Sequence, residues 1–169
     1  MKAAGVILAV AVALAVQTTL ARFIVRGAVA VDLVLVAVVY VALTSGPVTG
    51  LLAGTLAGLI QDTLSSGVIG IGGLAKTIVG FVAGIIGTQF IVAQPLPRFV
   101  VFFGATVLHA IVFMGLYVVL DVRHFGTPYA AVAGQAVGNA VVGVVAFQLV
   151  ELLPGAMERR KAQRGRLRR

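Results

Sequence analysis

The chain has 169 residues, of which 60% are hydrophobic and 11% charged, with a mean hydropathy of +1.13. Soluble domains are roughly 45–50% apolar and about 25% charged, so the composition argues against a soluble globular fold, and high hydrophobicity excludes disorder. The absence of cysteine excludes disulfides, thiol catalysis and cysteine-ligated metals. A spanning helix needs about 20 residues, so the length suits one compact bundle of about six helices and leaves no room for an additional soluble domain.

Loop signals divide the apolar sequence into segments. The first run, after Lys2, has features of a signal peptide, but it is long for one and more membrane segments follow, so we read it as a retained span. A turn is predicted at residues 45–47, a glycine-rich loop at 65–73, and a break at Pro95 and Pro97. The expected fold is all-α, a polytopic membrane bundle of about six transmembrane helices. The predicted spans are 3–20, 28–44, 48–64, 74–92, 99–120 and 129–153.

The net charge of +8 is concentrated at one end of the chain. Residues 154–169 carry +6 and residues 1–153 only +2, so the basic character mainly describes a tail, which we expect to be disordered. With six spans the termini share one side, and that side holds nine Lys and Arg residues against three or four opposite. Positive residues favour the cytoplasmic side, so both termini are predicted to lie in the cytoplasm.

The basic tail is expected to fix topology and to contact anionic lipids, at about 1 kcal/mol for each basic residue near the leaflet. An acidic cytoplasmic partner is the alternative. No aromatic residue is interleaved with the charges, so we expect no nucleic acid partner. The basic residues are Arg159, Arg160, Lys161, Arg164, Arg166, Arg168 and Arg169.

Glycines recur every fourth residue in the third and fourth spans. Glycine lets helix backbones approach closely, which stabilises helix contacts in lipid. Two readings stay open: packing within the bundle, or a binding face for another membrane protein, and both can hold for different glycines. The residues are Gly46, Gly50, Gly54, Gly58, Gly80 and Gly84.

Two charges stand at one membrane edge, on either side of the loop at 65–73. Asp62 ends the third span and Lys76 begins the fourth. Because a charge inside the membrane is costly, we expect Asp62 and Lys76 to pair and to pin the loop. The alternative is that each side chain reaches the headgroup region alone.

Other polar residues lie within spans, notably His109, Gln135 and Asn139. Hydrogen bonds between helices are the ordinary explanation, and a polar pocket or proton relay is the alternative. Metal ligands would need clustering, but His109 and His124 fall on different segments, and no nucleophile elbow or phosphate loop is present. The chain is therefore predicted to be no enzyme, with no catalytic residue, cofactor site or metal site.

The run from Val31 to Gly84 resembles the MreD family of rod shape-determining proteins. The order and spacing of several short motifs together carry the resemblance, although none is specific alone. These motifs are Asp32-Leu33, Tyr40-Val41-Ala42-Leu43, Gly58-Leu59-Ile60-Gln61-Asp62, Leu64-Ser65-Ser66, Gly70-Ile71 and Thr77-Ile78-Val79-Gly80-Phe81, followed by Gly84.

The resemblance implies a non-enzymatic inner-membrane scaffold of the bacterial elongation machinery, acting in lateral peptidoglycan synthesis. Its implied partners are MreC above all, then RodA, a class B penicillin-binding protein and MreB. From the glycine spacing, and not from the resemblance, we expect the glycine-rich helix faces to bind them. It also implies a fold similar to the substrate-binding subunits of energy-coupling-factor vitamin transporters. This fold relation supplies one rival function, a vitamin-binding transporter subunit. A small ion or proton transporter is a separate, less favoured alternative.

Overall fold

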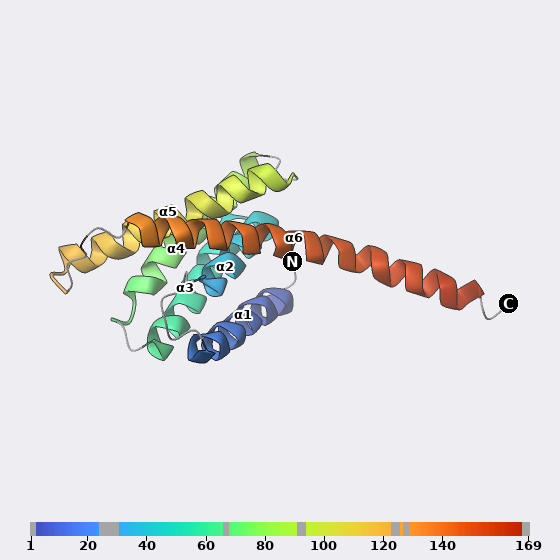
Figure 1. The fold of residues 1–169 in the computed structure, drawn as a ribbon, viewed down its shortest axis with the longest axis horizontal. Coiled ribbons are helices and arrows are strands. Elements are labelled where there is room, and N and C mark those ends of the chain that lie inside the picture. Colours follow the sequence, from blue (N-terminus) through green and yellow to red (C-terminus); the bar gives the residue numbers. More distant parts are fainter. Residues whose placement is uncertain are drawn as a thin grey trace.

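The computed structural model is a bundle of helices (Figure 1). It describes the backbone of residues 3–23, 31–65, 68–90, 94–122, 126 and 129–166, and the side chains in these ranges except those of 3, 20–23 and 153–166. These ranges contain six helices and no strand, so the predicted all-α class is confirmed. The helices are α1 (Ala3–Phe23), α2 (Leu33–Ser45), α3 (Pro47–Leu64), α4 (Ile71–Gln89), α5 (Pro95–Val119) and α6 (Tyr129–Arg166).

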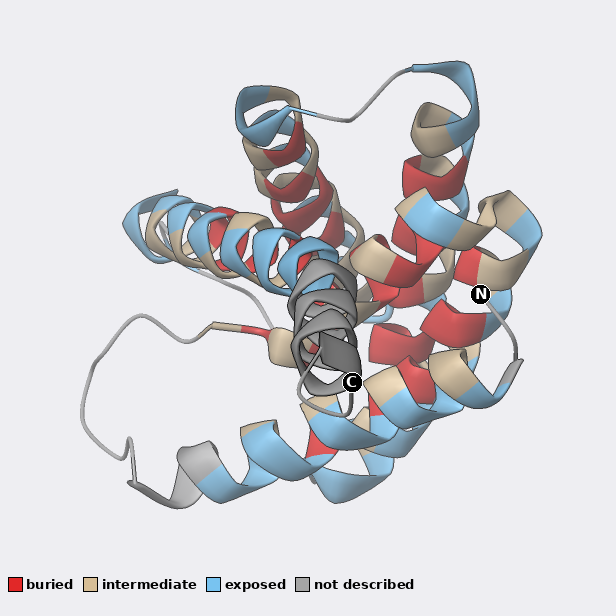
Figure 2. Cartoon of the chain, turned by 90° about the vertical axis from the view of Figure 1, so that its right-hand side faces the viewer, coloured by how far each residue is buried: buried red, intermediate tan, exposed pale blue. Residues whose placement is uncertain are grey.

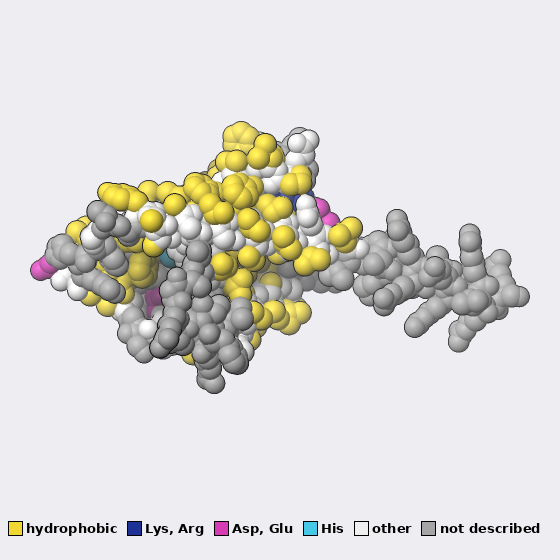
Figure 3. Space-filling view, in the orientation of Figure 1, with side chains coloured by type: hydrophobic (Ala, Val, Ile, Leu, Met, Phe, Trp, Pro, Cys, Tyr) yellow, Lys and Arg dark blue, Asp and Glu magenta, His cyan; other side chains and the backbone are white. Residues whose placement is uncertain are grey.

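The outer surface is that of a membrane protein. Helices α4 and α5 and residues Tyr129–Leu152 of α6 are long and apolar enough to cross a bilayer. Shorter apolar stretches lie in α1 and α2. Hydrophobic side chains cover much of the face drawn in Figure 3, and large ones such as Ile111 and Val119 are exposed. Lipid tails can cover this surface, whereas water would leave it as an extensive apolar patch.

Several helix ends differ from the sequence prediction: α1 ends three residues later, α4 begins and ends three residues earlier, and α2 begins at Leu33 because Asp32 caps it there. Helix α5 begins at Pro95, earlier than the predicted start at Phe99, because a proline in the first turn of a helix removes only an N–H that has no partner there. Helix α6 extends to Arg166, past the predicted end at Leu153, so the chain stays helical into the segment that we expected to be disordered. The side chains of the basic tail lie outside the described residues.

Helix α2 is the centre of the bundle. It contacts all five other helices, and seven of its 13 residues are buried. Its sequence is apolar on every side, as a helix surrounded by other helices requires. At 1.5 Å per residue it is about 20 Å long, shorter than the roughly 30 Å hydrocarbon core. At least one end of α2 therefore lies below the membrane surface.

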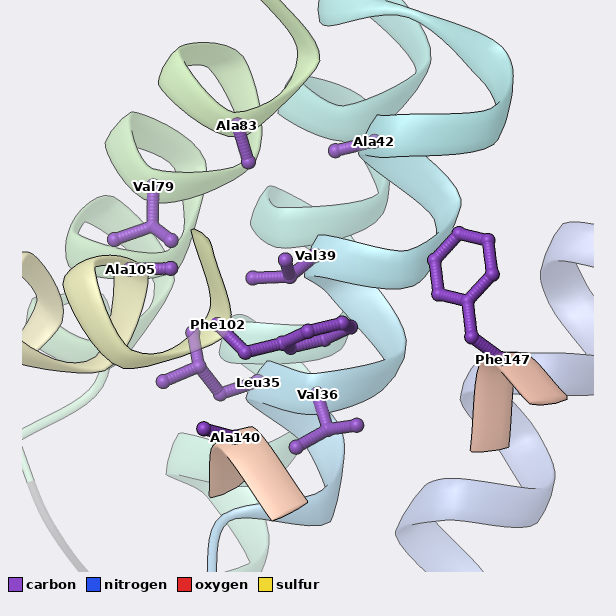
Figure 4. Close-up of a cluster of buried hydrophobic side chains, with 10 residues drawn as sticks. All are labelled: Leu35, Val36, Val39, Ala42, Val79, Ala83, Phe102, Ala105, Ala140 and Phe147. Atoms are coloured by element: carbon purple, nitrogen blue, oxygen red, sulfur yellow. The ribbon is translucent and has the colours of Figure 1, made fainter. Parts of the chain in front are cut away.

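The main core lies where α2 meets α4, α5 and α6 (Figure 4), and buried residues line the inward faces of the helices in Figure 2. Phe102 is the largest fully buried side chain and sits among the residues of α2. Gly143 makes room for it, because a Cβ at Gly143 would lie 2.6 Å from the Phe102 ring. The cluster consists of Leu35, Val36, Val39, Ala42, Val79, Ala83, Phe102, Ala105, Ala140 and Phe147.

The regularly spaced glycines of α3 and α4 pack against each other inside the bundle. These two helices form its most extensive contact. A Cβ at Gly58 would lie 2.6 Å from the Cα of Gly73, and Gly50 and Gly80 meet backbone to backbone. The hydroxyls of Thr55 and Thr77 hydrogen-bond across the same contact at 2.8 Å. Of the two readings, the structure supports packing within the bundle, because the helices bury these glycines against each other. The buried glycines are Gly50, Gly54, Gly58, Gly80 and Gly84.

Gly46 has a different role from the other predicted glycines. It forms the turn between α2 and α3 with a φ of +88°, which side chains rarely allow. A Cβ there would approach nothing closer than 4.0 Å. Its backbone conformation, and not close packing, therefore requires glycine.

Candidate functional site: a buried polar network at the start of α2

Asp32 is the N-cap of α2, and its carboxylate belongs to a buried network of polar side chains. Its Oδ1 accepts a hydrogen bond from the backbone N–H of Leu35 at 2.9 Å, which caps the helix. Its Oδ2 lies 3.0 Å from the Nζ of Lys76 in α4, and both side chains are buried. A buried ion pair requires further hydrogen bonds to offset the loss of water, and the neighbouring helices supply them.

Helix α5 contributes His109 to the network. The Nζ of Lys76 lies 3.3 Å from the Nε2 of His109. An ammonium group only donates, so Nε2 accepts and the proton of a neutral ring is on Nδ1. The ring of Phe113 stacks on His109 with the centroids 5.6 Å apart. Lys76 thus joins the carboxylate of Asp32 to the imidazole of His109.

Helix α6 completes the network through Asn139, which is fully buried. Its Oδ1 accepts from the backbone N–H of Asp32 at 2.8 Å, and its Nδ2 donates to the hydroxyl of Thr106 in α5 at 3.1 Å. Gln135, also predicted to bond between helices, lies half-buried one turn earlier. The network therefore ties α2, α4, α5 and α6 together inside the bundle.

The predicted pair of Asp62 and Lys76 is wrong, because Lys76 pairs with Asp32. The Oδ2 of Asp62 instead accepts from the backbone N–H groups of Gly70 at 2.9 Å and Gly73 at 3.0 Å. The first N–H groups of a helix lack partners within it and carry partial positive charge, so a carboxylate at the start of α4 is favourable. Asp62 does hold the loop, but through backbone donors.

Replacing Asp62 with alanine should loosen the start of α4. The change removes the carboxylate that accepts both hydrogen bonds. Losing such a cap lowers the stability of a helix by about 0.5–2 kcal/mol. Hydrogen exchange should become faster at Gly70 and Gly73, whereas Thr63→Ala, on the exposed side of the same turn, serves as the control. Unchanged exchange at both glycines would contradict the capping role.

A second ion pair joins the first turn of α5 to the middle of α6. The guanidinium of buried Arg98 makes two hydrogen bonds to the carboxylate of Glu151, one of them 3.0 Å long. It also lies 4.3 Å above the centroid of the Phe147 ring, whose neighbour is Tyr40 of α2. The planar guanidinium of arginine can make two parallel hydrogen bonds and stack on an aromatic ring at the same time. These contacts hold α5 against α6.

Sequence reasoning missed the role of Asp32, which entered only as part of a family motif. A signal for it was present, since an aspartate directly before a long apolar run is a typical helix N-cap. Among the described residues, no group of three or more His, Asp or Glu side chains could hold a metal ion. The ammonium of Lys76 itself occupies the position between Asp32 and His109 that a cation would need.

Comparison with known proteins assigns the chain to a family. A family model described as rod shape-determining protein MreD matches residues 2–154. The chain belongs to the MreD family. The match spans Asp32, Lys76, His109 and Asn139, so the polar network lies wholly inside the family region. No curated protein and no solved structure matches the chain, and the predicted likeness to vitamin-transporter subunits stays a prediction.

Membership in the MreD family makes this chain a rod shape-determining membrane protein. Its helical bundle with an apolar outer surface agrees with that class.

Proposed function

We propose that this MreD-family protein is a non-enzymatic scaffold of the bacterial cell-elongation machinery, active in lateral peptidoglycan synthesis. The family match over residues 2–154 carries the proposal. The polar network supports it, because the carboxylate, ammonium and amide groups bond one another across four helices. Groups used in this way stabilise a fixed shape, which is what a scaffold needs.

The proposed location is the bacterial inner membrane, with several spans and both termini in the cytoplasm. The excess of Lys and Arg on the side of the termini supports this orientation. Reporter fusions at each end test it: both should give a cytoplasmic signal, and a periplasmic signal at either end would reject the proposed orientation.

MreC is the first proposed partner, followed by RodA, a class B penicillin-binding protein and MreB. Because α3 and α4 bury their glycines against each other, MreC needs another surface. An apolar groove of about 400 Å³ lies between α4 and α5, lined by residues including Ile86, Val100 and Leu108. Gly104 also lines it, and a Cβ there would meet nothing within 4 Å. We propose that this groove receives the single spanning helix of MreC.

Co-purification of MreC with the tagged chain tests the groove. Gly104→Leu should fill it and reduce recovery of MreC about tenfold, which corresponds to 1.4 kcal/mol. Gly115→Leu is the matched control, since Gly115 lies on the same helix with open space around it but outside the groove. Equal recovery with both variants would reject the groove, and no recovery with the unaltered chain would reject MreC as a partner.

One observation favours a second candidate, a small ion or proton transporter. Ionisable residues within membrane helices often mark ion pathways, and Asp32, Lys76 and His109 are of this kind. This candidate predicts proton or cation flux in liposomes that Lys76→Met abolishes. The scaffold predicts no flux, together with retained binding of MreC.

A further inference from the structure

A second hollow, distinct from the groove, lies between α1, α2 and α3. Its volume is about 620 Å³, which falls in the range of small-molecule sites. Its lining comes from the last part of α1, the first turn of α2 and the end of α3. These three ends lie together at one end of the bundle, so the hollow opens near the ends of its helices.

Among the residues that the structure describes, the lining combines polar and apolar side chains and includes no charged one. Gln17, Thr18, Gln61 and Ser65 supply two amides and two hydroxyls beside apolar walls that include Leu64. Uncharged amide and hydroxyl groups recognise ligands through hydrogen bonds, and a few such groups in an apolar wall fix the ligand's orientation.

One of these groups lacks a partner. The Oε1 of Gln61 is buried and accepts no hydrogen bond within the part of the chain that the structure describes. By contrast, the Oε1 of Gln17 accepts from the backbone N–H of Val34 at 3.1 Å. A buried acceptor left unpaired is costly and calls for an explanation, such as a bound molecule that donates to it.

Two charged side chains that the structure describes near the hollow, those of Asp62 and Lys76, have partners elsewhere. Asp62 follows Gln61 in the sequence, but its carboxylate accepts from Gly70 and Gly73. Lys76 is paired with Asp32 in the polar network. The lining residues that the structure describes offer no counter-charge to an ion that loses water on entering the hollow, so they favour an uncharged molecule.

We propose that this hollow binds a small uncharged solute, of the alcohol or amide class, that donates a hydrogen bond to the Oε1 of Gln61. The site goes beyond the scaffold function and does not depend on it. Since Val34 belongs to the same turn of α2 as the cap at Asp32, an occupied hollow would contact the helix that organises the bundle.

Thiol labelling tests the site, because the chain has no cysteine of its own. Thr18→Cys places one thiol in the lining, and Thr63→Cys places one on an exposed position of α3 outside it. The full chain in nanodiscs is treated with hydroxyethyl, sulfonatoethyl and trimethylammonioethyl methanethiosulfonate, which carry uncharged, anionic and cationic heads. For each probe, the rate at the Thr18→Cys thiol is divided by the rate at the Thr63→Cys thiol. This ratio should be about five times larger for the hydroxyethyl probe than for either charged probe.

A second comparison tests the role of Gln61. Ethyl methanethiosulfonate lacks the hydroxyl, so the advantage of the hydroxyethyl probe over it should disappear when Gln61→Leu is added and should persist with Gln135→Leu. Ser65→Cys is a second thiol position in the lining, for use if Thr18→Cys does not fold. The proposal is overturned if the three heads react alike at lining and control thiols, or if Gln61→Leu leaves the preference unchanged. Neither result affects the co-purification of MreC, so the scaffold proposal is tested separately.

Discussion

Replacing Lys76 with methionine is expected to lower the free energy of unfolding by about 3–5 kcal/mol. The change leaves the carboxylate of Asp32 without its ion partner at a position where only 6% of the residue is exposed. Asp32→Asn should cost a similar amount, because the ammonium of Lys76 would then be buried without a counter-charge. Denaturant unfolding of the purified protein in detergent measures both variants.

Combining Asp32→Asn with Lys76→Met should recover much of this loss. The double variant has no buried charge at the site, and asparagine can still cap α2. It should therefore be more stable than either single variant. Asp62→Asn with Lys76→Met is the control, and its two effects should simply add, since Asp62 bonds backbone groups. Stronger coupling of Lys76 to Asp62 than to Asp32 would contradict the structure.

Replacing Gly54 with alanine is the second change with a large expected effect. A Cβ at this position would lie 2.6 Å from the carbonyl carbon of Lys76 and 2.9 Å from the backbone nitrogen of Thr77. Helix backbone cannot move aside as a side chain can, so α3 and α4 would have to separate. Overpacking of this kind costs about 1–3 kcal/mol, and Gly54→Leu should prevent the helices from packing.

Gly104→Ala provides the matched control for Gly54→Ala. Both glycines lie inside helices, so alanine brings the same gain in helix propensity of about 1 kcal/mol. At Gly104 the new Cβ meets nothing, and this variant should be as stable as the unaltered protein or slightly more stable. The difference between the melting temperatures of the two variants therefore measures the cost of the clash between α3 and α4. Equal melting temperatures would show that α3 and α4 do not approach as closely as described.

The helices of this fold follow from local sequence, but the polar network does not. Apolar runs and loop residues placed the six helices, and the four-residue glycine spacing pointed to the packing of α3. Helix ends were less predictable, as Pro95 shows: the sequence marked a break, whereas the helix starts there. A proline is unfavourable inside a helix but is compatible with its first turn. The residue alone therefore does not show whether it lies in a loop or begins a helix.

The ion partner of Lys76 illustrates why the site was harder to predict. Asp62 is near in sequence, across one loop, while Asp32 lies far earlier in the chain. Lys76 lies on α4 one turn beyond the N–H groups that Asp62 caps, on a face buried against α2 and α5. Which face of α4 meets α2 depends on the arrangement of the whole bundle. Asp32, Asn139 and Thr106 come together only through that arrangement.

The central claim is that the polar network holds the scaffold together and performs no chemistry of its own. The most direct test is the shape of cells whose only copy of this protein carries Asp32→Asn with Lys76→Met, produced at the normal folded level. This scaffold should keep its structure without the two charges, so the cells should remain rods and MreC should still co-purify. Round cells despite a normal amount of folded protein would contradict the claim and would assign the buried charges a direct role.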